Sequence, residues 1–377
     1  MGNKKTPAVP KTASEAKSSK YGLELLSKYR GAIMGIAALW ILFFHLWQKQ
    51  VTEPGRLYDF ETYIQRIGFC GVDIFLFLSG IGLVFAIGKS NVLSFYYRRL
   101  KRVFLPFFIV GLIRCITEKW LPEVFWKNVL GINFYKVSMY SFLWFVPAII
   151  TLYLLFPLYW KLFSRSSNKL VFTAAMFILW AGASVYFRGD LREDLYGFTN
   201  RIPVFLFGVY AGWLTKNKKI EFTKTTWFML TAALATGLYY AYMANILGWT
   251  FIVPVSNCSF PNMLIAISFP FVFAKLLDML CSIPKAGVIG KIINKFFGFF
   301  GLFSLEIYCV QEWLGGKVLA EMVEKTPQQK NLMIFVVSTV AGFVLYLVVK
   351  YFWVLLELAV RKIAGFIKKK KASAGQQ

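Results

Sequence analysis

Few titratable side chains lie within the apolar stretches of this chain, and they limit the chemistry it could perform. His45 is the only histidine, and it lies near the end of an apolar run that begins at about residue 31. Imidazole titrates near neutral pH, so His45 is a candidate general base. The alternative is a structural histidine that bridges two helices. We expect no metal site, because His45 has neither a second histidine nor an acid cluster beside it.

Asp73 lies near the start of the next apolar stretch. If the two stretches are antiparallel helices, His45 and Asp73 fall at the same end. A charged group at the centre of a membrane helix costs roughly 2.5–3.5 kcal/mol, so such a residue is a functional candidate. An aspartate can hold an imidazole in one tautomer and stabilise the imidazolium. We therefore predict His45 and Asp73 as the catalytic residues, with capping of a helix as the alternative role for Asp73.

A third feature is a basic block over residues 94–106, which contains Arg98, Arg99 and Arg102. Arginine binds phosphate through two parallel hydrogen bonds, which suits recognition of a phosphorylated cofactor. The block is therefore a candidate cofactor-binding site. Its alternative interpretation is a topology signal that contacts lipid headgroups.

The composition identifies the setting of these residues. Hydrophobic residues make up 58% of the 377 positions, and charged residues only 16%, whereas a soluble domain carries about 25% charged residues. This excludes a soluble enzyme, a disordered protein and a nucleic-acid-binding domain, and it leaves an integral membrane protein. The net charge of +25 lies mostly between apolar segments, which is typical of loops that face anionic lipid.

The apolar segments predict an all-α, polytopic bundle of about ten transmembrane helices. Continuous apolar runs favour helices, because unpaired backbone groups cannot face lipid. The predicted helices cover residues 31–48, 67–88, 103–117, 140–160, 170–187, 202–215, 226–246, 262–281, 297–316 and 332–357.

Charge predicts the orientation of this bundle. Most of the 43 lysines and arginines fall in segments that an amino terminus inside the cell would leave inside, so both termini are expected to be cytoplasmic. The loop at 188–194, which mixes acids with bases, is expected outside. We predict a basic, disordered tail over 1–25, a membrane domain over 26–360 and a second basic tail over 361–377.

Taken in order, these features resemble the acyltransferase-3 family of membrane acyltransferases. The first helix ends in a characteristic histidine, and the second carries a signature that the basic block follows; later matches are weaker. The similar stretches are Met34–His45, Gly71–Gly80, Phe95–Pro106, Leu143–Ala148, Arg201–Gly208 and Gly301–Tyr308.

The resemblance implies a function. Members transfer an acyl group, usually acetyl, from cytoplasmic acyl-CoA to a hydroxyl of an extracytoplasmic sugar or cell-surface polysaccharide. It also implies a multi-pass protein of a bacterial plasma membrane, whose partners are the lipid bilayer and a glycan acceptor. The family histidine matches His45, but the family arginine eleven positions earlier is replaced by Met34. Arg30, one helical turn before Met34, lies on the same helix face and is its candidate substitute.

Other residues are candidates for substrate binding. Trp144 lies in one of the similar stretches, and Arg201 and Glu312 are expected at the same outer level as His45. With Arg30, these complete the predicted substrate contacts. Sequence does not choose between direct transfer, with His45 as base, and an acetyl-histidine intermediate. Two rival functions are a transporter or flippase for a lipid-linked glycan, and a non-catalytic partner of a polysaccharide synthase.

Overall fold

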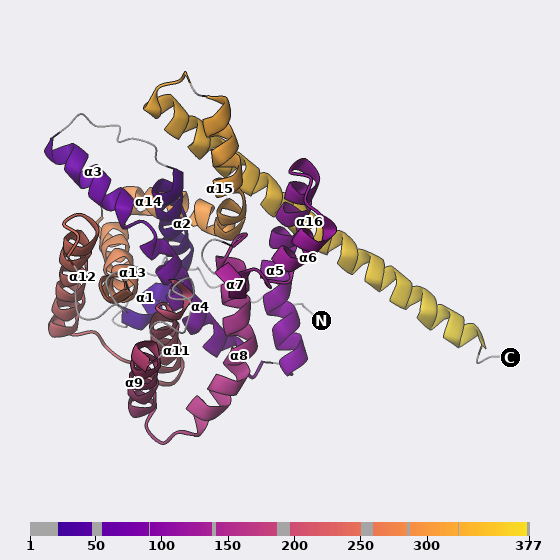
Figure 1. Ribbon diagram of the computed structural model, residues 1–377. Coiled ribbons are helices and arrows are strands. Elements are labelled where there is room, and N and C mark those ends of the chain that lie inside the picture. Colours follow the sequence, from indigo (N-terminus) through magenta and orange to yellow (C-terminus); the bar gives the residue numbers. More distant parts are fainter. Residues whose placement is uncertain are drawn as a thin grey trace, which may run out of the picture.

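A computed structural model describes residues 22–46, 55–89, 91–137, 141–186, 197–249, 259–284, 287–322 and 324–374. Within these residues the secondary structure is helical, without a strand, which confirms the all-α prediction (Figure 1). The helices are α1 (Gly22–Lys28), α2 (Arg30–Leu46), α3 (Arg56–Arg66), α4 (Cys70–Ala86), α5 (Val92–Thr117), α6 (Pro122–Val129), α7 (Phe134–Val137), α8 (Phe145–Arg165), α9 (Lys169–Tyr186), α11 (Ile202–Asn217), α12 (Lys224–Asn245), α13 (Ser259–Ser282), α14 (Gly287–Leu302), α15 (Ser304–Glu321) and α16 (Pro327–Ala374).

Nine of the ten predicted segments each coincide with one helix of the structure. The prediction of a single helix over 297–316 is wrong, because the chain bends by 67° between α14 and α15. The helix α16 continues to Ala374, so it includes most of the basic segment that we predict as the tail over 361–377. The loop at 188–194 and residues 1–21 lie outside the described part of the chain.

The number of membrane crossings stays a prediction. Three helices are long and apolar enough to cross a bilayer alone, and three bent pairs raise the number to at most six by length and composition. Other helices are short: α4 has 17 residues and α11 has 16, whereas a straight crossing takes about 20.

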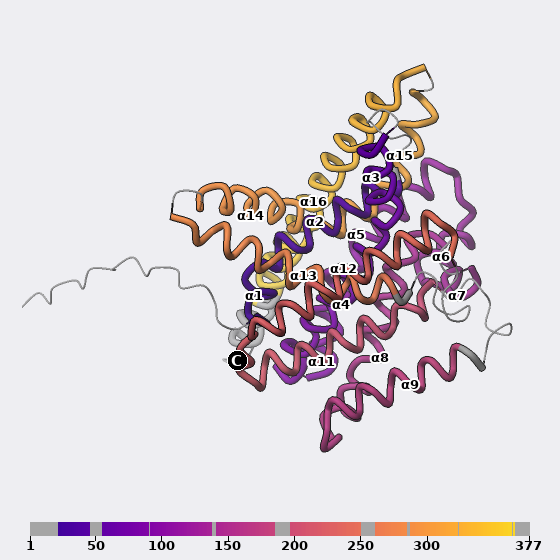
Figure 2. The backbone as a smooth tube through the Cα atoms, turned by 90° about the vertical axis from the view of Figure 1, so that its left-hand side faces the viewer, coloured from indigo at the N-terminus to yellow at the C-terminus, as the bar shows by residue number. Residues whose placement is uncertain are grey.

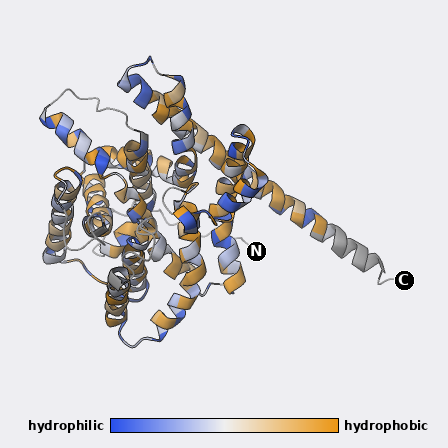
Figure 3. Ribbon diagram, viewed as in Figure 1, coloured by the Kyte–Doolittle hydropathy of each residue, from blue (hydrophilic) through white to orange (hydrophobic). Residues whose placement is uncertain are grey.

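Hydrophobic residues occur along most of the helices (Figure 3), and many of their side chains are exposed on the outside of the bundle. Ile178 on α9, Phe228 on α12 and Leu355 on α16 expose 72%, 73% and 65% of their surface. An apolar exterior of this extent is unfavourable in water and favourable in lipid. The fold is therefore that of a helical membrane protein.

Two glycine contacts fix the helices that carry the predicted catalytic residues. A Cβ atom on Gly35 of α2 would overlap the carbonyl oxygen of Phe297 on α14, and one on Gly208 of α11 would overlap the carbonyl oxygen of Phe77 on α4. Membrane helices pack through such small residues, because lipid supplies no hydrophobic drive for their association. These contacts bring α2 and α4 close to α14 and α11.

Three of the short helices lie at one end of the bundle. In Figure 2, α3, α6 and α7 are on the right-hand side, and α1 and α14 are toward the left. The left-hand end, which includes α1, is the side that we predict to be cytoplasmic from the distribution of lysine and arginine.

This orientation predicts opposite labelling of two exposed connections. Lys119, between α5 and α6, should be accessible from outside, and Ser167, between α8 and α9, from the cytoplasm. In a chain whose native cysteines are replaced, Lys119→Cys should react with an impermeant maleimide in intact cells. Ser167→Cys should react only after the cells are opened. The reverse pattern would invert the predicted topology.

Candidate active site

His45 lies at the end of α2 and is paired with Glu312 of α15. Its Nδ1 atom is 3.2 Å from Oε1 of Glu312, and both side chains are partly exposed. A carboxylate at Nδ1 holds the imidazole so that Nε2 is left to accept a proton. This is the arrangement of a general base with an orienting acid.

Asp73 has a different partner from the one we expected. Its Oδ1 atom is 3.3 Å from Nε of Arg201, at the start of α11, and the Arg201 guanidinium lies over the ring of Trp144 at 5.2 Å. Close packing of α4 against α11 brings Asp73 to Arg201, so the acid beside His45 is Glu312. Asp73 is the fourth residue of α4, whose N-cap is Phe69; it is thus within the first turn rather than the cap.

An inner cavity of about 240 Å³ lies between α2, α4, α5, α8 and α15. Arg30 and Arg99 line it, together with Met34 and Tyr153. The guanidinium of Arg30 donates to the carbonyl oxygen of Leu78 at 3.0 Å. Arg30 therefore brings its charge to the cavity that Met34 also lines, as expected of residues one turn apart on α2.

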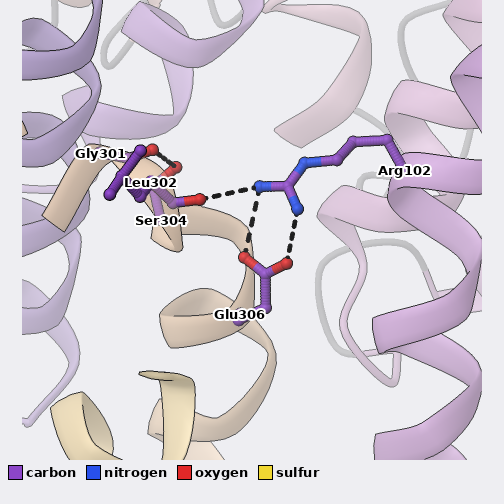
Figure 4. A network of polar contacts seen from close by, with 5 residues as sticks. All are labelled: Arg102, Gly301, Leu302, Ser304 and Glu306. Atoms are coloured by element: carbon purple, nitrogen blue, oxygen red, sulfur yellow. Dashed lines mark hydrogen bonds and ion pairs between the residues drawn. The ribbon is translucent and has the colours of Figure 1, made fainter. Parts of the chain in front are cut away.

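Arg102 of the same basic block is engaged with a buried acid. Its Nη1 atom lies 2.7 Å from Oε1 of Glu306, and its Nη2 atom donates to the carbonyl oxygen of Leu302 at 3.1 Å (Figure 4). The Glu306 side chain is fully buried. Leu302 is the last residue of α14, so its carbonyl oxygen has no following turn of the same helix to donate an N–H to it. Arg102 thus joins α5 to the bend between α14 and α15.

The inner cavity consequently carries two arginines that are not in ion pairs. Among the described residues, the hydrogen bonds of Arg30 and Arg99 run to backbone carbonyl oxygens, those of Leu78 and Gly82. Two like charges at one cavity repel each other, and an anionic ligand reverses this cost. The cavity is therefore suited to an anion such as a phosphate.

An outer cavity of about 510 Å³ lies near α6 and α7; no sequence pattern predicted it. Trp120, Asn128, Asn133 and Glu312 are among its lining residues. The two amides are joined to each other, with Asn133 Nδ2 donating to Asn128 Oδ1 at 2.6 Å. Amides both donate and accept hydrogen bonds, and an indole offers a flat apolar face. This combination suits a ligand with hydroxyl groups.

One turn of α15 separates the two cavities. Tyr308 lines the inner cavity, and Glu312, four residues later, lines the outer one. The Tyr308 hydroxyl accepts a hydrogen bond from the backbone N–H of Phe145 at 3.1 Å, so its own proton is available to a ligand. Phe145 lines the inner cavity and Leu143 the outer one. The wall between the cavities is therefore only a few side chains thick.

Arg98 faces away from the inner cavity. It lines a separate groove with Lys101 and Lys350, whereas its neighbour Arg99 lines the inner cavity. Adjacent residues on a helix do not share a face, so a contiguous basic block on α5 serves two surfaces. Sequence alone treats the three arginines as one group.

Comparison with known proteins identifies the class. The all-helical, apolar fold is that of a membrane protein, and a family model described as an acyltransferase domain matches residues 32–351. Because this match covers most of the chain, the protein belongs to the acyltransferase-3 family, and it is accordingly a membrane acyltransferase. No curated protein and no solved structure matched the chain.

Proposed function

We propose that this protein transfers an acyl group, acetyl in the simplest case, from cytoplasmic acyl-CoA to a hydroxyl of an extracytoplasmic sugar. The observation that carries the proposal is the pair of cavities on either side of one turn of α15. The inner one is lined by arginines, and the outer one by amides and aromatic groups together with Arg114 and Lys136. Glu312, the partner of His45, lines the outer cavity.

The donor occupies the inner cavity in this proposal. Acyl-CoA carries several phosphates, and Arg30 and Arg99 supply charge-assisted hydrogen bonds to them. Arg102 acts less directly, because its guanidinium is already paired with Glu306. It positions α15, and hence Tyr308, relative to α5.

The acceptor hydroxyl approaches His45 from the outer cavity. Nε2 of His45 removes the hydroxyl proton as the oxygen attacks the thioester carbonyl carbon. A C–O bond forms, the C–S bond breaks, and the thiolate of CoA takes up a proton. Tyr308 donates a hydrogen bond to the carbonyl oxygen while it carries negative charge. An acetyl-histidine intermediate would use the same residues.

The proposed activity is tested with sealed membrane vesicles that have their cytoplasmic face outward. Acetyl-CoA labelled in its acetyl group is added, and lumenal carbohydrate is isolated and counted. The proposal expects label in an alkali-labile ester on carbohydrate, only when the protein is present. Glycan that enters the lumen without label would support the rival transporter, and no change in either measurement would leave only the assembly-partner alternative.

Replacing both arginines of the inner cavity should weaken use of the donor. A charge-assisted hydrogen bond contributes about 1.5–3 kcal/mol, so Arg30→Gln/Arg99→Gln should raise the KM for acetyl-CoA at least about tenfold. The double variant Arg361→Gln/Lys362→Gln removes the same charge from the exposed, distal part of α16 and should leave this KM unchanged. Equal KM values for all three proteins would show that the inner cavity is not the donor site.

A further inference from the structure

A second basic site lies where α16 crosses α5. This groove, of about 290 Å³, is here named the seam groove. Its cations come from both helices, and its floor is aromatic and apolar. Its main lining residues are Arg98, Lys101, Arg102, Lys350, Tyr346 and Trp353.

The charge of the seam groove favours an anionic ligand. Four cations line it, and no carboxylate does. Glu357 is 2.8 Å from Lys101, and Glu306 pairs with Arg102. Lys350 is exposed and lies over the ring of Tyr346 at 6.0 Å. The surroundings therefore keep a net positive charge at the mouth of the groove.

The apolar side chains of the seam groove indicate the kind of ligand as clearly as its charge does. The ammonium of Lys101 lies over the Trp353 ring at 4.4 Å, which places a cation directly above an aromatic floor. Beside the groove, Val348, Phe352 and Leu355 of α16 are exposed. A ligand with a phosphate head and hydrocarbon chains matches both features, because the chains can lie along α16 below the cations.

The seam groove is distinct from the proposed donor site. Arg102, which pairs with Glu306 (Figure 4), lines both spaces, but the other residues of the seam groove do not line the inner cavity. The residues of the groove belong to α5 and α16, and α16 extends away from the bundle beyond them (Figure 1). A soluble nucleotide has no hydrocarbon chains to pack against this apolar flank, whereas a membrane lipid has them.

We propose that the seam groove binds the phosphate headgroup of an anionic phospholipid. Basic pockets between membrane helices bind such headgroups through the same combination of lysine, arginine and adjacent apolar surface. The bound lipid fastens α16 to α5. Through Arg102 it also supports the bend that positions Tyr308. This inference does not depend on the acyl acceptor.

Equilibrium binding of fluorescent phosphatidylglycerol to the detergent-solubilised full chain tests the proposal. Each basic residue near a lipid surface contributes about fivefold in affinity. Arg98→Gln/Lys350→Gln should therefore bind the probe at least about tenfold more weakly than the original protein. Arg361→Gln/Lys362→Gln is the control with the same loss of charge, and it should keep most of the affinity. Lys350→Gln alone, with an expected loss of about fivefold, replaces the double variant if the latter does not elute as a folded protein.

Competitors then distinguish the sources of phosphate. Unlabelled phosphatidylglycerol should displace the probe, and neither phosphatidylcholine nor free CoA should do so at equal concentration. Displacement by CoA would make the seam groove part of a nucleotide site and overturn the proposal. Equal losses in the seam and control variants would also overturn it, because the binding would then follow net charge alone.

Discussion

Replacing His45 with glutamine should reduce acyl transfer by about 10²–10⁴-fold, the usual contribution of a general base. Glutamine keeps the size and hydrogen bonding of the side chain but cannot take up the hydroxyl proton. His45 is partly exposed at the end of α2, so the variant should insert and fold normally. The measurement is transfer of labelled acetyl to carbohydrate, with size-exclusion chromatography as the control for folding. Near-normal transfer would identify His45 as a structural histidine.

The acid partner of His45 can be tested in the same assay. Glu312→Gln removes the carboxylate at Nδ1 of His45, and Asp73→Asn removes the one at Arg201. If Glu312 orients the imidazole, its variant should lower kcat more than KM, because the interaction strengthens as the imidazolium forms. Raising the pH should not restore the kcat of Glu312→Gln. A normal kcat for Glu312→Gln with a strongly reduced kcat for Asp73→Asn would favour the pairing that we predicted from the sequence.

Replacing Arg102 with methionine should destabilise the fold by about 3–5 kcal/mol, the cost of leaving one member of a buried ion pair alone. Glu306 is completely buried, whereas 47% of the Arg102 side chain is exposed. Glu306→Gln should therefore cost less, because the arginine that remains can be hydrated. Denaturation of the purified protein in detergent measures both losses.

A double variant separates the ion pair from its surroundings. Arg102→Met/Glu306→Leu removes both charges and replaces them with apolar side chains, which is often neutral or favourable for a buried pair. Its stability should exceed that of Arg102→Met alone, which would demonstrate coupling between the two sites. If the double variant loses as much stability as the two single variants together, Glu306 does not depend on Arg102. The bend between α14 and α15 is then held by other contacts.

The helices were largely predictable from sequence. A run of apolar residues that is buried in lipid must satisfy its own backbone, and the α-helix is the local way to do so. This reasoning predicted the central parts of α2, α4 and α16. It did not predict the break at Phe303, between α14 and α15. The segment 297–316 is apolar throughout its first part, so hydropathy gives no sign of the bend. At the bend, Arg102 of α5 donates a hydrogen bond to the carbonyl oxygen of Leu302, the last residue of α14.

The sequence by itself determined which chemical groups are available: one histidine, a few acids within apolar stretches and one basic block. Their types follow from the chain alone, and so do most of the helices that carry them. Only the tertiary structure decided their partners. It paired His45 with Glu312 rather than Asp73, gave Glu306 to Arg102, and divided Arg98 from Arg99. The physical reason is that ion pairs act over a few ångströms between helices far apart in sequence, so the packing of those helices selects each pair.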